Sequence, residues 1–122
     1  MNNIIGVAAG IYDKFGIEAA FKSIKEIGYQ YIELAYAEKF FENLITKPEE
    51  MNEKDIDKII GLCSKYDVQV NALSVFFYLM TENGVDRLKK VLDVAASLGA
   101  STVVTDTGKI GIDEEDKKKV FY

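Results

Sequence analysis

The sequence of 122 residues contains no histidine. This absence excludes Ser-His-Asp catalysis, Cys-His catalysis and any histidine-ligated metal site within this chain taken alone. Cysteine occurs once, as Cys63, so a single chain cannot form a disulfide framework. Cys63 falls beside Ile59 and Ile60 on the apolar side of an expected helix, which favours a buried thiol over a reactive one.

Long apolar runs and basic clusters are also scarce. No segment approaches the length that crosses a membrane and no signal-like region begins the chain, so we expect a cytoplasmic protein without a membrane partner. Twenty acidic and fifteen basic residues give a net charge of −5, and the single basic run, 117–119, follows acidic residues. Because phosphate binding depends first on positive charge, no nucleic-acid partner is expected.

The residues that are present repeat a helix followed directly by a short strand. In the segment 16–36, apolar residues recur at helical spacing, Gly28 ends the helix, and Tyr31–Leu34 reads as a mostly buried strand. The segment 85–106 has the same order, with Thr102–Thr105 as its strand. A helix that leads into a strand is half of a βαβ unit, which favours a parallel sheet with right-handed connections.

Two further segments complete this pattern. Residues 2–10 predict a first strand buried on both sides, and Val68–Ser74 alternates as a strand after a helix whose N-cap is Asn52. A fourth helix is expected from Asp113, and the chain stops within it, so we interpret residues 1–122 as a single domain truncated at the start of this helix. The pattern alone fits both an open doubly wound sheet and half of an eight-stranded barrel.

Three fragments carry a resemblance to a known family: Tyr31-Ile32-Glu33-Leu34, Asn71-Ala72-Leu73-Ser74 and Leu98-Gly99-Ala100-Ser101-Thr102-Val103-Val104-Thr105. In this order and spacing, the chain resembles the amino-terminal half of the xylose isomerase-like TIM-barrel superfamily. That superfamily includes sugar and sugar-phosphate isomerases and epimerases, inosose-type enzymes and type IV apurinic endonucleases. The resemblance implies an α/β fold, a (βα)4 parallel half-barrel that is the amino-terminal half of a TIM (β/α)8 barrel.

The resemblance also implies a function. A complete relative would be a sugar or sugar-phosphate isomerase or epimerase that moves a proton next to a carbonyl with a divalent metal, manganese or magnesium, with zinc as an alternative. Such relatives hold the metal with carboxylates and a histidine in the second half of the barrel, beyond Tyr122. No catalytic residue, metal ligand or cofactor is therefore assigned to this chain alone, which we expect to be inactive. The endonuclease branch matches less well, because it uses early-loop histidines where this chain has Phe76 and Phe77.

Polar and aromatic side chains are expected at the carboxyl ends of the strands, where parallel α/β folds place their sites. Glu33 is the only carboxylate in a strand core, and alternation turns it to the barrel interior, either into a polar network or toward a substrate. Asp106 either holds a sugar hydroxyl or forms an ordinary turn. Aromatic side chains suit sugars but also simply cover a barrel mouth. The residues expected to bind a small sugar or sugar phosphate are Tyr12, Glu33, Tyr36, Ser74, Phe76, Thr105 and Asp106.

An alternative function is a non-catalytic assembly module. A parallel half-barrel leaves two unpaired, apolar strand edges, which predicts a homodimer or higher self-association that completes a barrel. A flavodoxin-like sheet that binds a nucleotide is disfavoured, because the loop 10–16 has bulky aromatic residues in place of a phosphate loop. The long connection 36–50, which contains the only proline, Pro48, is interpreted as a lid.

Overall fold

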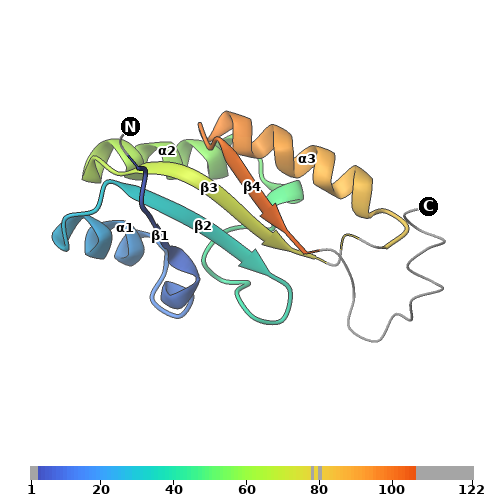
Figure 1. Cartoon of the computed structure of the whole chain (residues 1–122), viewed down its shortest axis with the longest axis horizontal. Coiled ribbons are helices and arrows are strands. Elements are labelled where there is room, and N and C mark those ends of the chain that lie inside the picture. Colours follow the sequence, from blue (N-terminus) through green and yellow to red (C-terminus); the bar gives the residue numbers. More distant parts are fainter. Residues whose placement is uncertain (1–2, 78, 80, 107–122) are drawn as a thin grey trace.

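The computed structural model describes residues 3–77, 79 and 81–106, in which strands and helices alternate along the chain (Figure 1). The elements are β1 (Gly6–Ala8), η1 (Ala9–Tyr12), α1 (Ile17–Glu26), β2 (Tyr31–Ala37), η2 (Pro48–Glu50), α2 (Glu53–Tyr66), β3 (Gln69–Phe76), α3 (Gly84–Ser97) and β4 (Thr102–Thr105). The expected fourth helix from Asp113 lies outside the described residues. Among the helices of the described part, none has the length and apolar character needed to cross a membrane.

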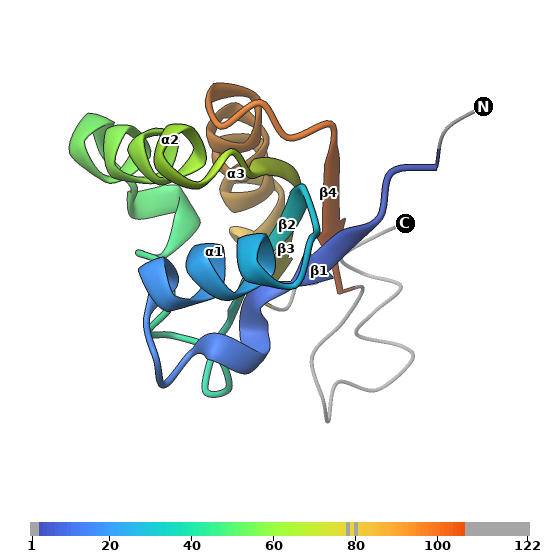
Figure 2. The same cartoon turned by 90° about the vertical axis from the view of Figure 1, so that its left-hand side faces the viewer.

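The strands of the described part form one parallel sheet in the order β1-β2-β3-β4, so neighbours in sequence are neighbours in the sheet. Figure 2 shows α1, α2 and α3 on the same face of this sheet. Right-handed crossovers between successive strands place every connecting helix on one side, which explains this arrangement. A doubly wound sheet carries helices on both faces. The structure therefore confirms the (βα)4 half-barrel.

Local sequence signals set the ends of the helices. The Asn52 side chain accepts a hydrogen bond from the backbone N–H of Asp55 at 3.1 Å, and the Asp55 carboxylate accepts one from the backbone N–H of Asn52 at 3.2 Å. This reciprocal capping box starts α2 at the expected residue. Asp67 ends α2 in the left-handed region, with φ of 52°, and Gly28 after α1 has φ of 93°.

The hydrophobic core lies between the sheet and the three helices. Residues paired across parallel strands share a face, and the face toward the helices carries buried Ile32, Leu34, Leu73 and Val75. The opposite face, here called the inner face, is not covered by any helix of the described part (Figure 2). Its rows follow from the strand register: Ala8, Glu33, Ala72 and Thr102 in one, and Ala35, Ser74 and Val104 in the next.

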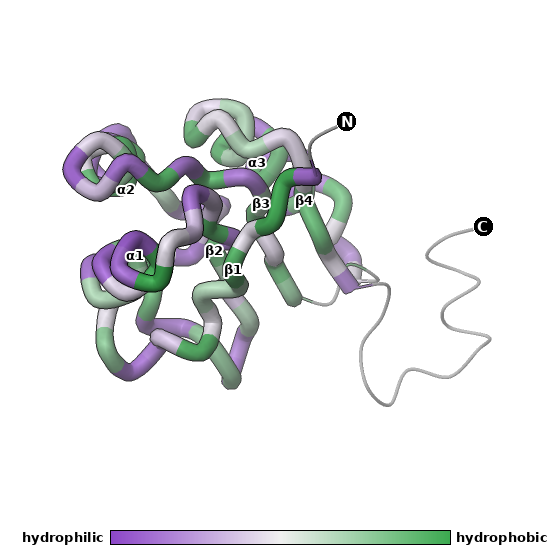
Figure 3. The backbone as a smooth tube through the Cα atoms, turned by 60° about the vertical axis from the view of Figure 1, so that its left-hand side comes forward, coloured by the Kyte–Doolittle hydropathy of each residue, from purple (hydrophilic) through white to green (hydrophobic). Residues whose placement is uncertain are grey.

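The first strand is shorter and less buried than its sequence predicts. Ile4 and Ile5 precede β1 and are exposed, and Ala8 within β1 is also exposed. The expectation of a strand buried on both sides is wrong, because β1 lies at an edge of the sheet with its inner face uncovered. Figure 3 shows apolar residues along this edge. At Gly6, an added Cβ would lie 2.4 Å from Oδ1 of Asn71, so a larger residue there would displace the Asn71 side chain.

Candidate functional site

The inner face of the sheet holds a hydrogen-bonded pair of polar side chains, Glu33 from β2 and Ser74 from β3. Ser74 Oγ lies 2.5 Å from Glu33 Oε1 and donates to it. Ser74 is buried, whereas Glu33 is half-buried. The alternation of β2 places Glu33 on this face as expected, between the outward-facing Ile32 and Leu34. A carboxylate removed from water needs such a partner, and Ser74 supplies it.

Two further expected residues lie near the carboxyl ends of the strands. Phe76 is the last residue of β3, shares the inner face with Ser74 by alternation, and is 37% exposed. Asp106 follows β4, and its Oδ1 accepts a hydrogen bond from the backbone N–H of Leu79 at 3.3 Å. Asp106 therefore ties the loop after β3 to the end of β4. The structure thus brings Glu33, Ser74 and Phe76 onto one face, with Asp106 at its end.

Tyr12, Tyr36 and Thr105 are not brought to the Glu33–Ser74 pair. Tyr12 lies in η1, and its hydroxyl is 2.8 Å from Ser23 Oγ on α1. Tyr36 and Thr105 are both in register with Val75, on the face toward the helices. The reason is the period of two in a strand, because a residue three positions after the inward Glu33 points outward.

Tyr36 is a buried member of the core, and its surroundings are acidic. Burial raises the pKa of the Tyr36 hydroxyl, and the nearby carboxylates of Glu42 and Glu38 raise it further. Thr105 Oγ1 is buried without a hydrogen-bond partner among the described residues. Both side chains contribute to packing between sheet and helices, on the side of the sheet that faces away from Glu33.

A cluster of four charged residues at the carboxyl ends of β2 and β3 was not anticipated from the sequence. This rim cluster consists of Glu38, Lys47, Glu49 and Arg87. Arg87 Nε donates to Glu49 Oε1 at 2.5 Å and Arg87 Nη2 donates to Glu38 Oε1 at 2.7 Å. Arg87 Nη1 also donates to the carbonyl oxygen of Phe77 at 3.2 Å, and the guanidinium lies 4.3 Å from the centre of the Phe77 ring.

The rim cluster is largely removed from water. The side chains of Arg87 and Glu49 are 15% and 9% exposed, and Lys47 Nζ lies 3.7 Å from Glu38 and 3.8 Å from Glu49. Burial opposes the charge of Arg87, but its hydrogen bonds to Glu38 and Glu49 outweigh burial and raise its pKa. The rim cluster thereby holds together three separate segments: the one after β2, the one before α2 and the first turn of α3.

The connection that precedes α2 is held in place at several points and does not resemble a lid. The Asp13 carboxylate accepts hydrogen bonds from the backbone N–H groups of Asn43 and Leu44 at 2.9 and 3.0 Å and from Asn43 Nδ2 at 2.9 Å. Leu44 and Ile45 are buried in the core, and Glu49 is bound to Arg87. The connection 36–50 therefore adds to the core on the helix side of the sheet and does not cover the inner face.

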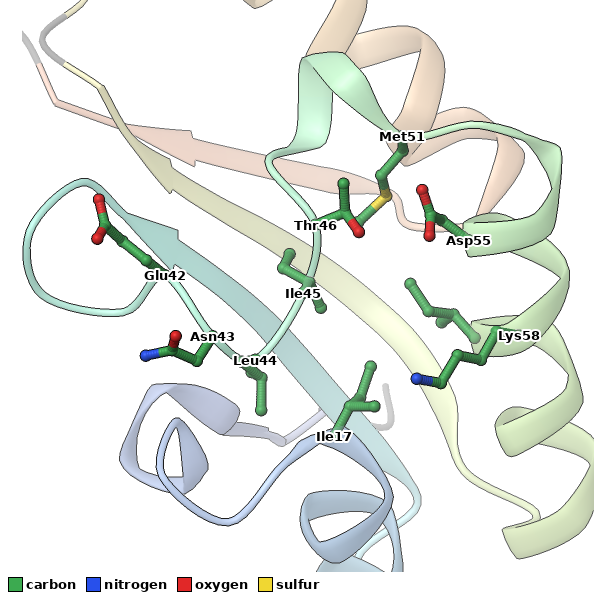
Figure 4. Close-up of a pocket in the computed structure, with 10 residues that line it drawn as sticks. Ile17, Glu42, Asn43, Leu44, Ile45, Thr46, Met51, Asp55 and Lys58 are labelled. Atoms are coloured by element: carbon green, nitrogen blue, oxygen red, sulfur yellow. The ribbon is translucent and has the colours of Figure 1, made fainter.

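A pocket of about 280 Å³ lies on the helix side of the sheet, between this connection and the first turns of α1 and α2 (Figure 4). Its lining residues are Ile17, Leu44, Ile45, Met51, Ile59, Glu42, Asn43, Thr46, Asp55 and Lys58. None of the expected binding residues lines it. Asp55 is already engaged in the capping box of α2, and Glu42 Oε1 accepts a hydrogen bond from the backbone N–H of Lys39. Lys58 is the cation among the lining residues, and Figure 4 shows it beside Ile17.

The described residues do not fit a divalent metal. They contain no group of three or more histidine, cysteine, aspartate or glutamate side chains placed to hold an ion. Glu33 alone, bound to Ser74, is too few ligands for a hard cation, which takes six or more oxygens. Cys63 on α2 is half-buried, so it is less covered than the buried thiol that its apolar neighbours predict, and burial raises the pKa of this thiol.

Comparison with known proteins supports the fold. No protein-family profile and no curated protein sequence matches this chain. Among solved structures, the chain is similar to a xylose isomerase domain containing protein from Salmonella typhimurium LT2, with a TM-score of 0.63 and 19% sequence identity. The match covers 98% of this chain and 44% of that one, so this chain spans less than half the length of its structural neighbour. The expected resemblance to xylose isomerase-like barrels is confirmed at the level of fold.

Proposed function

We propose that this chain is the amino-terminal half of a sugar or sugar-phosphate isomerase or epimerase barrel and that its inner face binds the sugar. The observation that carries the proposal is the Glu33–Ser74 pair on a sheet face that the described helices leave open, beside the partly exposed ring of Phe76. The similarity in fold to a xylose isomerase domain containing protein supports it. A cytoplasmic location and a role in carbohydrate metabolism belong to the same proposal.

The chemistry of the three side chains suits a polyhydroxylated ligand. Ser74 occupies one oxygen of the Glu33 carboxylate, and the other oxygen has no hydrogen-bond partner among the described residues. A carboxylate oxygen accepts a sugar hydroxyl strongly because the acceptor is charged. The Phe76 ring offers an apolar surface for the C–H face of the sugar. Proton transfer next to a carbonyl would be completed by groups that this half does not supply, so this chain binds and orients.

Binding can be tested by NMR titration of ¹⁵N-labelled protein with a ketose, the matching aldose and a phosphorylated ketose. We expect chemical-shift changes centred on residues 33, 74 and 76, and their loss in Glu33→Gln. Glu26→Gln is the matched control, because Glu26 is an exposed glutamate on α1. Changes centred on the 280 Å³ pocket on the helix side, or equal binding by both variants, would refute the site.

A second experiment tests whether this half of the barrel is inactive by itself. The protein is incubated with a ketose and a manganese or magnesium salt in D2O, and deuterium incorporation next to the carbonyl is followed by NMR. We expect no exchange above the rate with metal salt alone, since the described residues hold no cluster of metal ligands. Exchange that depends on the protein would show that this half is itself catalytic.

A further inference from the structure

We propose that the 280 Å³ pocket on the helix side of the sheet binds a small zwitterion, a free α-amino acid with an aliphatic side chain. Lys58 would hold the carboxylate of this ligand, Asp55 its ammonium group, and the apolar walls its side chain. The proposal goes beyond the proposed sugar site. It does not depend on that site, because the pocket and Glu33 lie on opposite sides of the sheet.

The pocket is formed by one continuous part of the chain. Its lining residues all fall between Ile17 and Ile59, in the first turn of α1, the connection that precedes α2 and the first half of α2. The lining includes no residue of the edge strands β1 and β4, so the shape of the pocket is independent of what lies beside either edge. Its volume is just below the range of about 300–1,000 Å³ that is usual for drug-sized ligands, which indicates a smaller ligand.

The walls of the pocket are apolar. Leu44, Ile45 and Ile59 belong to the buried core, which fixes their side chains in place. Ile17 and Met51 complete the walls, and Figure 4 shows Ile17, Ile45 and Met51 around this space. An aliphatic group is favoured there, because contact with these side chains removes its surface from water.

Two opposite charges on α2, Asp55 and Lys58, line the pocket without forming an ion pair with each other. Asp86 and Lys89 on α3 have the same spacing and do pair, at 3.8 Å. Asp55 differs because its Oδ2 accepts a hydrogen bond from the backbone N–H of Asn52, which holds the carboxylate at the start of the helix. Figure 4 shows the amino group of Lys58 pointing away from Asp55 and toward the apolar side chains. The two charges are therefore held apart at the pocket.

The other carboxylates near Lys58 are engaged elsewhere. Glu42 Oε1 accepts a hydrogen bond from a backbone N–H group of its own loop, and Figure 4 shows the Glu42 carboxylate directed away from Lys58. Glu18 on α1 is close enough for Lys58 to lower its pKa, but its carboxylate is hydrogen-bonded first to Lys65 and Tyr66. The amino group of Lys58 therefore remains available to a ligand.

These charges select a zwitterion. A ligand with a carboxylate alone would be attracted by Lys58 and repelled by Asp55, and a ligand with an amine alone would meet the reverse. The ammonium group of an α-amino acid can donate to Asp55 Oδ1, which accepts no hydrogen bond among the described residues. Its carboxylate can accept from Lys58, and its side chain then reaches the apolar walls. An α-amino acid with an aliphatic side chain matches all three features.

NMR titration of ¹⁵N-labelled protein with three ligands tests the pocket. The ligands are L-leucine, isocaproate, which is leucine without its ammonium group, and isoamylamine, which is leucine without its carboxylate. We expect leucine to shift the amide signals of residues 44–46, 51 and 55–59 with a dissociation constant on the order of 1 mM, and to bind at least about tenfold more tightly than either analogue. No shift at about 50 mM leucine, or an analogue that binds as tightly as leucine, would refute the proposal.

Charge variants test the two contacts, with circular dichroism to show that each variant is folded. Lys58→Gln and Asp55→Asn are each expected to raise the dissociation constant for leucine about tenfold, and asparagine keeps an oxygen acceptor for the cap of α2. Lys54→Gln is the matched control, because Lys54 is an exposed lysine on α2 that does not line the pocket. Either variant binding leucine as tightly as the control would overturn the proposal. The signals of residue 33 report on ketose binding in the same spectra, so the sugar site and this pocket can fail separately.

Discussion

Removal of the Arg87 guanidinium is expected to be the most destabilising single change at the rim. In Arg87→Met, the carboxylates of Glu38 and Glu49 lose their closest cation, and Glu49, whose side chain is 9% exposed, keeps only Lys47 at 3.8 Å. Removing one partner of a buried ion pair costs about 3–5 kcal/mol, because the other charge stays desolvated. We take the lower end, about 3 kcal/mol, because Glu38 is partly exposed and Lys47 compensates in part.

Thermal and urea unfolding followed by circular dichroism measure this loss. At roughly 4 °C per kcal/mol for a chain of this size, the melting temperature is expected to fall by about 12 °C. Arg87→Lys keeps the charge but not the planar fork, so we expect about half of this effect. Lys89→Met is the control, since the Lys89–Asp86 pair is exposed and long at 3.8 Å and contributes less than about 1 kcal/mol.

A double variant separates charge burial from loss of packing. Glu49→Gln combined with Arg87→Met removes the unpaired charge, and the double variant is expected to be more stable than Arg87→Met alone. A loss of less than about 1 kcal/mol in Arg87→Met, or strict additivity of the two changes, would show that the rim cluster is not the buried network that its distances indicate.

Two further predictions concern the folded state. Burial raises the pKa of Asp13, but hydrogen bonds from Asn43 and Leu44 outweigh it, so the pKa lies below 3.8 in the folded protein. The contribution of Asp13 to the free energy of unfolding is therefore complete above pH 3.8 and is lost as the pH falls through the lowered pKa. In urea unfolding, Asp13→Ala is expected to cost about 1–2 kcal/mol at pH 7 and little at pH values below the folded pKa. Gly6→Ala brings a Cβ to 2.4 Å from Asn71 and is expected to cost about 1–3 kcal/mol. Asn71→Ala in the same chain should recover most of that loss, and failure to recover it would place the strain elsewhere.

Much of the fold could be predicted because its signals are local. Asn52 and Asp55 stand three residues apart, which is enough to specify the start of α2, and the structure contains their capping box. The inward direction of Glu33 followed from alternation with its apolar neighbours. The same alternation applies to Tyr36, but the expected strand was too short to include it. Tyr36 was expected in the connection 36–50, but β2 continues to Ala37 and alternation turns Tyr36 to the core.

The rim cluster could not be predicted, because its partners are distant in sequence. Arg87 binds Glu49 and Glu38 across 38 and 49 residues, and no local pattern relates these positions. In sequence, glutamates and lysines in a connection resemble a solvated surface. In the structure, they are brought under the start of α3 and are largely removed from water. The signal that distinguishes the two cases is burial, which only three-dimensional packing provides.

The sequence by itself determined the order of strands and helices, the expectation of a parallel sheet and the inward placement of Glu33, because periodicity, caps and crossover handedness act within or between adjacent elements. The pattern left an open sheet and a half-barrel as alternatives, and the structure decided between them by placing α1, α2 and α3 on one face of the sheet. Only the tertiary structure decided which side chains meet. It joined Glu33 to Ser74, turned Tyr36 and Thr105 away from them, and placed the largely covered Arg87 side chain between two carboxylates. These contacts depend on strand register and on the packing of distant segments, which no local pattern encodes.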